Sequence, residues 1–221
     1  MLLAVDTSTA QIGLAIYDGS QVIGEYAWRS SQRHTVELAP AVFELLARCG
    51  LTADAIRVLA VALGPGSFTS LRVGISLVKG LAISRKLPLI GIPTLDILAA
   101  AQPPSRFPLA VVIQAGRGRL AVGWYKSSKK GWQAKGAARV VTLDMLADEI
   151  KSPTIVCGEL TSVERAKLAE SANIQLASPA QSVRRPAILA ELAWARWQAG
   201  HVDDEATLAP IYLHVAGSVP A

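Results

Sequence analysis

The order of expected strands and helices repeats along this chain of 221 residues, and the repeat limits the fold more than any single motif does. Three short β-type runs separated by turn residues come first, followed by a helix, a strand, a helix, a strand and a short helix. These segments are 2–7, 12–18, 21–28, 35–48, 56–63, 69–85, 87–92 and 94–101. The next stretch, 101–108, is rich in proline and has no periodicity, which is typical of a connection between two units.

After this connection the order begins again. The second series of segments is 109–116, 119–126, 136–141, 143–150, 154–160, 163–172 and 174–178, and a long helix over 185–200 follows. Two consecutive β-β-β-α-β-α-β series predict a duplicated, two-lobed α/β fold of the ribonuclease-H-like class (ASKHA, actin/Hsp70-like). We expect a first lobe over 1–104 and a second over 105–221, which includes the closing helix.

The composition is typical of a globular protein of the cytoplasm. Hydrophobic residues make up 51% of the chain, which is ample for a buried core. Cys49 and Cys157 lie too far apart in sequence for a CxxC metal knuckle, and two cysteines cannot form a disulfide framework. The N-terminus lacks a basic start and no apolar run has transmembrane length, so we expect no membrane association. The net charge of +5 permits contact with RNA, although the basic residues cluster only at 126–135 and 184–185.

The first expected strand ends at Asp6, which is followed by the hydroxyl residues Thr7, Ser8 and Thr9. In actin/Hsp70-like ATPases and sugar kinases this turn faces the phosphates of a nucleotide. Those proteins usually have glycine just after the aspartate, where this chain has Thr7. A polar turn in which the side chains cap their own backbone explains the same residues, so both interpretations remain open.

A second motif, Gly64-Pro65-Gly66-Ser67, joins an apolar run to a helix and has the look of a phosphate loop. It is not a Walker A loop, because no lysine follows Gly66 at the required place. Backbone amides at this helix start would suit an anion, but capping of the helix by Ser67 or Thr69 is the simpler interpretation. The candidate nucleotide-facing residues are Asp6, Thr7, Ser8, Gly64, Gly66 and Ser67.

Histidine and serine patterns argue against two further kinds of site. His34 has Leu38 four residues on, where a metal-binding helix would carry a second histidine. No GxSxG motif is present, and Ser67 has no identifiable local base. We therefore expect no catalytic residue, no protein metal site and no cofactor.

Tryptophans 124, 132, 194 and 197 lie in the second half among basic residues, an arrangement that could stack on RNA bases. The i, i+3 spacing of Trp194 and Trp197 on the closing helix instead favours a packing stripe.

Several of these stretches together resemble one protein family. They are "LLAVDTST", "IGLAIYD", "RHTVELAP", "GPGSFTSLRVGI", "GIPTLDILA" and the closing "PIYLH". On these motifs the chain resembles the TsaB (YeaZ) family of bacterial tRNA threonylcarbamoyladenosine biosynthesis proteins. The resemblance spans residues 2 to about 100 and is weaker in the second lobe.

The resemblance implies a non-catalytic relative of the metal-dependent transferase TsaD. Such a protein pairs with TsaD and with the ATPase TsaE to install threonylcarbamoyl on adenosine 37 of tRNAs that read codons beginning with A, and it forms homodimers when alone. The resemblance leaves open whether this subunit contacts tRNA, and any such contact would occur only within the complex. The resemblance places the partner interface on the helices over 35–48 and 69–84. The interface residues that we expect are His34, Leu38, Val42, Leu45, Leu46, Phe68, Thr69, Arg72, Val73, Ser76 and Gly80.

Three positions depart from the family pattern. Ser70 stands where the family commonly has glycine, and Gln114 and Arg119 stand where the second lobe usually carries acidic residues. These changes disfavour cation-assisted nucleotide binding. An ASKHA-fold ATPase or small-molecule kinase, suggested by Asp6 and the glycine loop, remains the alternative function, and a metallopeptidase is a third that the absent metal motif disfavours.

Overall fold

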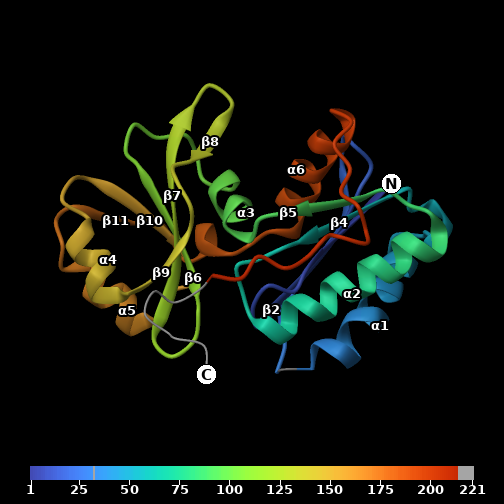
Figure 1. The fold of residues 1–221 in the computed structure, drawn as a ribbon, viewed down its shortest axis with the longest axis horizontal. Helices are drawn as coiled ribbons and strands as arrows, with labels where there is room; N and C mark the ends of the chain where they lie inside the picture. Colours follow the sequence, from blue (N-terminus) through green and yellow to red (C-terminus); the bar gives the residue numbers. More distant parts are fainter. Residues whose placement is uncertain (32, 214–221) are drawn as a thin grey trace. The chain divides into compact units, whose positions relative to one another are not determined.

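A computed structural model describes residues 1–31 and 33–213 of the chain (Figure 1). The chain forms two compact units, of which unit 1 contains Met1–Ile97 and Arg185–Ile211 and unit 2 is built on Leu98–Arg184. No helix among the described residues is long and apolar enough to cross a membrane. His214, the last residue of the quoted "PIYLH" motif, lies outside the described residues.

Unit 1 contains a five-stranded sheet in the order β3-β2-β1-β4-β5. The strands are β1 (Leu2–Asp6), β2 (Gln11–Tyr17), β3 (Val22–Arg29), β4 (Val58–Ala62) and β5 (Leu89–Ile92). The helices are α1 (His34–Arg48), α2 (Phe68–Arg85), α3 (Thr94–Ala100), which crosses into unit 2, and α6 (Pro186–Gln198), with a short 3-10 turn η1 (Ala53–Ala55). β1 pairs antiparallel with β2 and parallel with β4. The sequence predicted helices over 35–48 and 69–85, so the predicted bounds of α1 and α2 are correct to within one residue.

The two faces of β1 point into two separate hydrophobic cores, because successive side chains of a strand alternate between faces. Leu3 and Val5 lie in the core that α1 and α2 cover. Leu2 and Ala4 lie in the opposite core, which also contains residues of α6. The continuous apolar run of β1 is explained by this burial on both sides.

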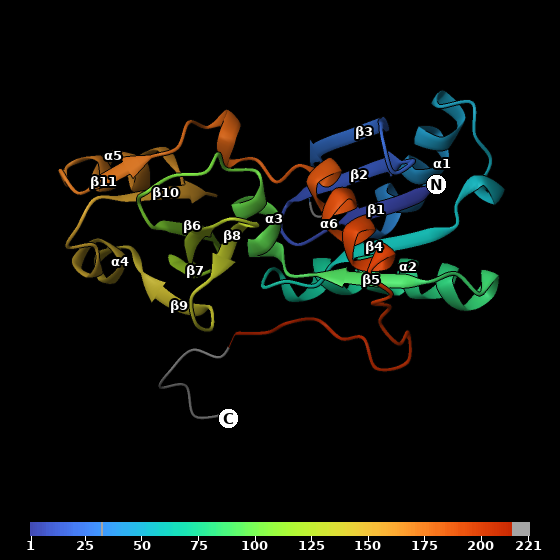
Figure 2. The same ribbon diagram turned by 90° about the horizontal axis from the view of Figure 1, so that it is seen from above.

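Helix α6 belongs to unit 1, whereas the sequence analysis placed the closing helix in the second lobe. Its buried residues Leu189, Ala190 and Ala193 pack in the same core as Leu2 and Ala4 of β1. Figure 2 shows α6 lying over the sheet of unit 1. The physical reason is that the sheet of unit 1 is apolar on both faces, while α1 and α2 cover only one. The unit boundary also falls at residues 97 and 98, before the predicted proline-rich connection.

Unit 2 repeats the topology of unit 1. Its strands are β6 (Leu109–Gln114), β7 (Arg119–Ser128), β8 (Gly131–Ala134), β9 (Arg139–Thr142), β10 (Thr154–Gly158) and β11 (Ile174–Leu176). The helices α4 (Leu143–Glu149) and α5 (Ser162–Ala169) and the 3-10 turn η2 (Ala180–Ser182) complete it. The order β11-β10-β6-β7-β8 matches β5-β4-β1-β2-β3, with the central strand again antiparallel to one neighbour and parallel to the other. The predicted duplicated ribonuclease-H-like fold is confirmed.

The sequence predicted one strand over 136–141, whereas the structure has two short strands in this region, β8 and β9. Strand β7 pairs with β9 through its first residues and with β8 through its last. Gly131, the first residue of β8 after the turn, has a φ of +99°, a conformation that glycine adopts without strain. Two short partners therefore share one long strand, and the exchange occurs near Trp124.

Candidate functional site

The predicted nucleotide-facing residues meet at the carboxyl end of β1, where they bond to one another and to Ser70 and Thr94. Asp6, Thr7 and Ser8 are each at most 2% exposed. The Asp6 carboxylate accepts a hydrogen bond from the Ser8 amide at 2.8 Å, and the Thr7 hydroxyl donates to the Ser70 carbonyl at 2.7 Å. The hydroxyl groups of Ser8 and Thr94 lie 2.6 Å apart. The bond between Asp6 and Ser8 is a capping contact of the kind expected of a polar turn, one of the two interpretations left open by the sequence, whereas the Thr7 and Ser8 hydroxyls bond to α2 and α3.

The glycine loop packs directly on this turn. The Ser67 amide donates to the Ser8 carbonyl oxygen at 2.7 Å, and a Cβ atom on Gly66 would lie 2.1 Å from the same oxygen. Gly64, with a φ of +104°, donates its amide to the Thr94 hydroxyl at 2.9 Å. The Ser67 side chain accepts from the Ser70 amide and so caps α2. The protein's own backbone fills the space beside Gly66. The amides of Ser8, Gly64 and Ser67 all donate to acceptors within the chain.

His34 is buried at the start of α1, with its Nε2 atom 2.9 Å from the Thr9 carbonyl oxygen. A protonated Nε2 donates to that oxygen, which ties α1 to the turn after β1. Leu38, one helical turn on, is 1% exposed in the core. Among the described residues, no three His, Cys, Asp or Glu side chains are placed to hold a metal ion. The buried side-chain nitrogen and oxygen atoms of the described residues all have hydrogen-bond partners.

Five of the predicted interface residues, all on α1, are buried rather than at the surface. Leu38, Val42, Leu45 and Leu46 are at most 5% exposed and pack in the core of unit 1, as His34 packs on the turn after β1. Leu38 and Leu45 hold α1 in position on the sheet. Val42 and Leu46 also pack in this core, and in addition they line an apolar groove between α1 and α2.

The exposed apolar residues of α1 lie on the opposite side of the helix. Val36 is 64% exposed and Phe43 is 65% exposed, and Pro40 and Ala47 are exposed as well. The spacing 36, 40, 43, 47 forms one stripe along a helix. The sequence analysis missed this stripe, although the same helical periodicity contained it.

On α2 the predicted interface residues are mostly at the surface. Exposed positions that follow helical spacing are Phe68, Thr69, Arg72, Ser76, Gly80 and Ile83, and Val73 is partly buried beside them. The Arg72 guanidinium lies over the Phe68 ring, 3.6 Å from its centre. A Cβ atom on Gly80 would meet no atom within 4 Å, so this glycine leaves the helix backbone open to close approach from outside.

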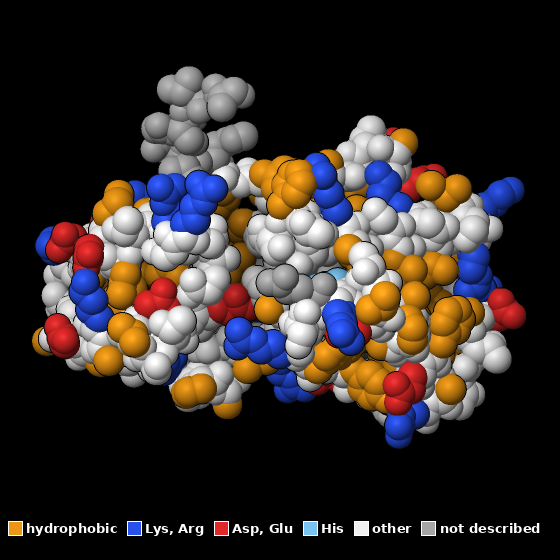
Figure 3. Space-filling model, turned by 90° about the horizontal axis from the view of Figure 1, so that it is seen from below, with side chains coloured by type: hydrophobic (Ala, Val, Ile, Leu, Met, Phe, Trp, Pro, Cys, Tyr) orange, Lys and Arg blue, Asp and Glu red, His pale blue; other side chains and the backbone are white. Residues whose placement is uncertain are grey.

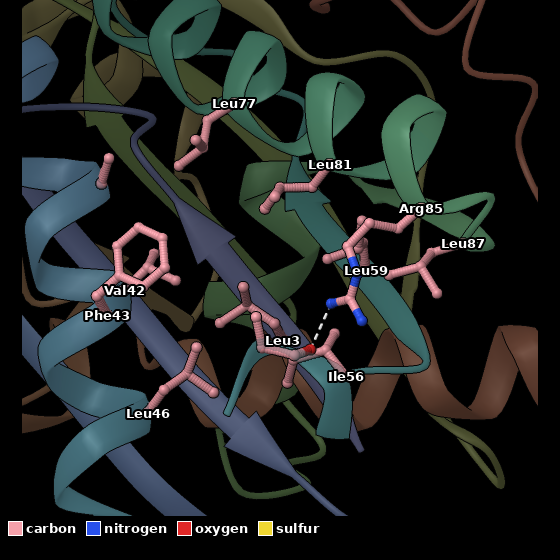
Figure 4. A pocket seen from close by; sticks show the side chains of 12 residues that line it. Leu3, Val42, Phe43, Leu46, Ile56, Leu59, Leu77, Leu81, Arg85 and Leu87 are labelled. Carbon is pink, nitrogen blue, oxygen red and sulfur yellow. Dashed lines mark hydrogen bonds between the residues drawn. The ribbon is translucent and has the colours of Figure 1, made fainter. Parts of the chain in front are cut away.

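An apolar groove runs between the two helices, and its floor is the sheet (Figure 4). Its volume is about 120 Å³. Phe43 and Leu46 of α1 line it from one side, Leu77 and Leu81 of α2 from the other, and Leu3 lies at the floor. Arg85 closes one end by donating to the carbonyl oxygen of Ala53 and to the Asp54 carboxylate. Apolar side chains gather on the face of unit 1 that carries α1 and α2 (Figure 3). We call this surface, made of the α1 stripe, the α2 stripe and the groove, the α1–α2 face.

Two residues of unit 2, Gln114 and Arg119, depart from the family pattern, and the side chain of Gln114 has a structural role. Gln114 ends β6, and its side-chain amide donates to the Glu159 carbonyl at 3.1 Å and to the Glu164 carboxylate at 2.9 Å. Glu164 also completes the capping box of α5 with Thr161. Gln114 therefore ties the end of a central strand to the start of a helix. Arg119 begins β7 at a partly buried position.

Comparison with known proteins places this geometry in a family. Residues 26–196 match the model of the family TsaD, tRNA N6-adenosine threonylcarbamoyltransferase. The chain is 30% identical to the tRNA threonylcarbamoyladenosine biosynthesis protein TsaB of Bacillus subtilis, over 97% of this chain and 94% of that protein.

Solved structures agree with the sequence match. YeaZ from Pseudomonas aeruginosa superposes with a TM-score of 0.78 at 24% identity, covering 96% of this chain and 99% of that one. A second Pseudomonas aeruginosa structure, of a protein with similarity to the peptidase YeaZ, gives a TM-score of 0.80 at 25% identity, with the same coverage. The chain therefore belongs to the TsaB (YeaZ) family of tRNA threonylcarbamoyladenosine biosynthesis proteins, within the wider family that the TsaD model describes.

Proposed function

We propose that this chain is a non-catalytic subunit that binds a TsaD-type transferase through the α1–α2 face, and that this contact is needed for threonylcarbamoylation of adenosine 37 in tRNAs that read codons beginning with A. The observation that carries the proposal is the pair of exposed stripes on α1 and α2 with an apolar groove between them. Contiguous apolar surface of this kind on a globular protein marks an interaction site. A helix pair on a partner fits it because side chains of one pair can enter the groove of the other.

The turn after β1 supports a non-catalytic role. Its acidic residue, Asp6, is buried and bonds to the Ser8 amide, and the Ser8 carbonyl fills the space beside Gly66. A bound phosphate would have to displace these contacts. The position four residues after His34, where a second histidine would complete a metal pair, holds the core residue Leu38.

The same face explains the other partners. With no transferase present, two copies of the chain would bury the α1–α2 face against each other in a symmetric homodimer. Binding of the transferase would replace that contact, and a TsaE-type ATPase would join the resulting complex. The oligomeric state of the free chain is then linked to its activating role.

A reconstituted reaction tests the proposal. The cognate TsaD-type and TsaE-type proteins, a threonylcarbamoyl-adenylate source and tRNA are combined with and without this chain, and threonylcarbamoyladenosine is measured in the digested tRNA. We expect product formation to depend on the chain. Equal product without it would refute the activating role, and product made by the chain alone would refute its non-catalytic status.

A further inference from the structure

We propose that unit 2 carries an RNA-binding groove, lined by Trp124, Lys126, Lys135 and Lys151, that holds a single-stranded segment of RNA. The groove is separate from the α1–α2 face, since all its residues lie in unit 2. Its volume is about 480 Å³, which is within the range of pockets that hold small organic ligands, and a nucleotide is of that size.

The groove exists because α4 is short. Val156 of β10, Ala110 of β6 and Trp124 of β7 are paired neighbours, so they lie on one face of the sheet. Val156 and Ala110 are part of the core beneath α4 and α5, and Trp124 packs against it. Two residues further along their strands, Thr154 and Lys126 continue the same face. Helix α4 ends at Glu149, so this end of the sheet is left open and lines the groove.

Three separate segments bring lysines to this opening. Lys126 lies on β7, and Lys135 follows β8, where its amide donates to the Trp124 carbonyl at 2.7 Å. Lys151 follows the C-terminal end of α4 and offsets the partial negative charge of that helix end. All three side chains are exposed, and none forms an ion pair with another described residue.

The acidic residue of the groove is already neutralised. Glu149 forms an ion pair with Arg139 of β9. The groove therefore presents three uncompensated positive charges, which attract a chain of phosphates.

An aromatic side chain beside the lysines favours RNA over an acidic peptide. Trp124 is partly exposed and lines the groove next to Lys126. Proteins that bind single-stranded nucleic acid combine basic residues, which follow the backbone, with aromatic rings on which bases stack. The identity of this RNA as tRNA rests on the proposed function, whereas the RNA-binding groove itself does not.

The test is a titration of a fluorescently labelled oligouridylate of about 15 nucleotides with the full chain, followed by anisotropy between about 50 and 200 mM salt. We expect saturable binding that unlabelled tRNA displaces. Lys126→Ala/Lys135→Ala should weaken binding about tenfold at the lower salt concentration, and it should reduce the salt-dependence slope by about 1.4, because two phosphate contacts are lost.

The matched control is Lys129→Ala/Lys130→Ala, which removes the same charge from the exposed turn between β7 and β8, outside the groove. Equal weakening by both double variants would overturn the proposal, because general surface charge would then explain the binding. Absence of saturable binding to the wild-type chain up to about 0.1 mM would also overturn it.

A second variant tests stacking. Trp124→Leu should weaken RNA binding at least fivefold and leave binding of a polyglutamate peptide unchanged. Polyglutamate that binds as tightly as the RNA would overturn the proposal in favour of an acidic protein partner. Thermal unfolding checks that each variant is folded, and the lysine variants test the proposal even if Trp124→Leu unfolds. These measurements use the chain alone, so their outcome is independent of the reconstituted reaction.

Discussion

The backbone of Ser8 and the α-carbon of Gly66 are in direct contact, so that a Cβ atom on Gly66 would lie 2.1 Å from the Ser8 carbonyl oxygen. The loop that looks like a phosphate cradle in the sequence thus packs against another turn of the same chain. Glycine is required here for close packing of two backbone segments, which is a structural reason independent of any ligand.

The variant Gly66→Ala should destabilise the protein by about 1–3 kcal/mol, because the added methyl group overlaps backbone that cannot move freely. The matched control is Gly80→Ala. Gly80 lies inside α2 with no atom within 4 Å of an added Cβ, so alanine should stabilise the protein by about 0.5–1 kcal/mol. Urea unfolding measures both changes. A neutral effect of Gly66→Ala would show that the contact relaxes in solution.

Phe43→Glu or Ile83→Glu should abolish the stimulation of a TsaD-type transferase without unfolding the chain. Each residue is more than half exposed on the α1–α2 face, so a charge there meets water in the monomer and an apolar surface in the complex. The chain-dependent product of the reconstituted reaction should fall at least about tenfold, which is the effect of a loss of about 1.4 kcal/mol in binding.

The control for this pair is Val163→Glu, because Val163 is 75% exposed on α5 of unit 2. It should behave like the wild-type chain in the same reaction. If all three variants lose equal activity, the α1–α2 face is not the contact surface.

The isolated chain should bind ATP with magnesium only weakly, with a dissociation constant above about 1 mM. The amides of Ser8 and Ser67 already donate to Asp6 and to the Ser8 carbonyl, so a phosphate would have to break these bonds to enter. Isothermal titration calorimetry measures the affinity. Binding a hundredfold tighter than this would revive the alternative of an ASKHA-fold ATPase or kinase.

Cys157 should be unreactive in the folded protein. Burial raises the pKa of its thiol to about 12, from the ordinary value of 9.0, so the reactive thiolate is scarce at pH 8. A disulfide reagent at pH 8 should modify Cys157 only on the time scale of unfolding, which is best measured in a Cys49→Ser background. Fast modification of Cys157 in that background would contradict the burial.

The same raised pKa of Cys157 gives stability a pH dependence. The unfolded thiol loses its proton near pH 9, whereas the folded thiol keeps it up to about pH 12. The contribution of this thiol is therefore fully present below pH 9 and decreases as the pH rises above it. The difference in urea unfolding between wild type and Cys157→Ala should narrow between about pH 8 and pH 10.

Periodicity in the sequence was sufficient to predict the helices α1 and α2, but not to predict which of their faces is exposed. Val36, Phe43 and Leu46 are all apolar, and the helix carries apolar residues around most of its circumference. Position along a helix cannot say which apolar side meets the sheet. Only the burial of Leu38 in the core, and the exposure of Phe43, distinguishes the supporting side of α1 from the side that faces outward.

Long-range pairing explains the other differences. Nothing near Pro186 in the sequence indicates that α6 packs on β1, because the two are separated by the whole of unit 2. The groove of unit 2 was also missed as a site. Lys126 and Lys135 were recognised as basic, but Lys151 joins them only through the pairing of β6 with β7 and β10.

The position of α6 has a consequence for synthesis on the ribosome. The strands of unit 1 are complete by Ile92, yet the helix that covers their second face ends at Gln198. At bacterial elongation rates the ribosome needs about 5–20 s to add the intervening hundred residues. During that interval Leu2, Ala4 and Ile90 lack the cover that α6 provides, so the nascent chain presents an apolar sheet face to chaperones before the fold is finished.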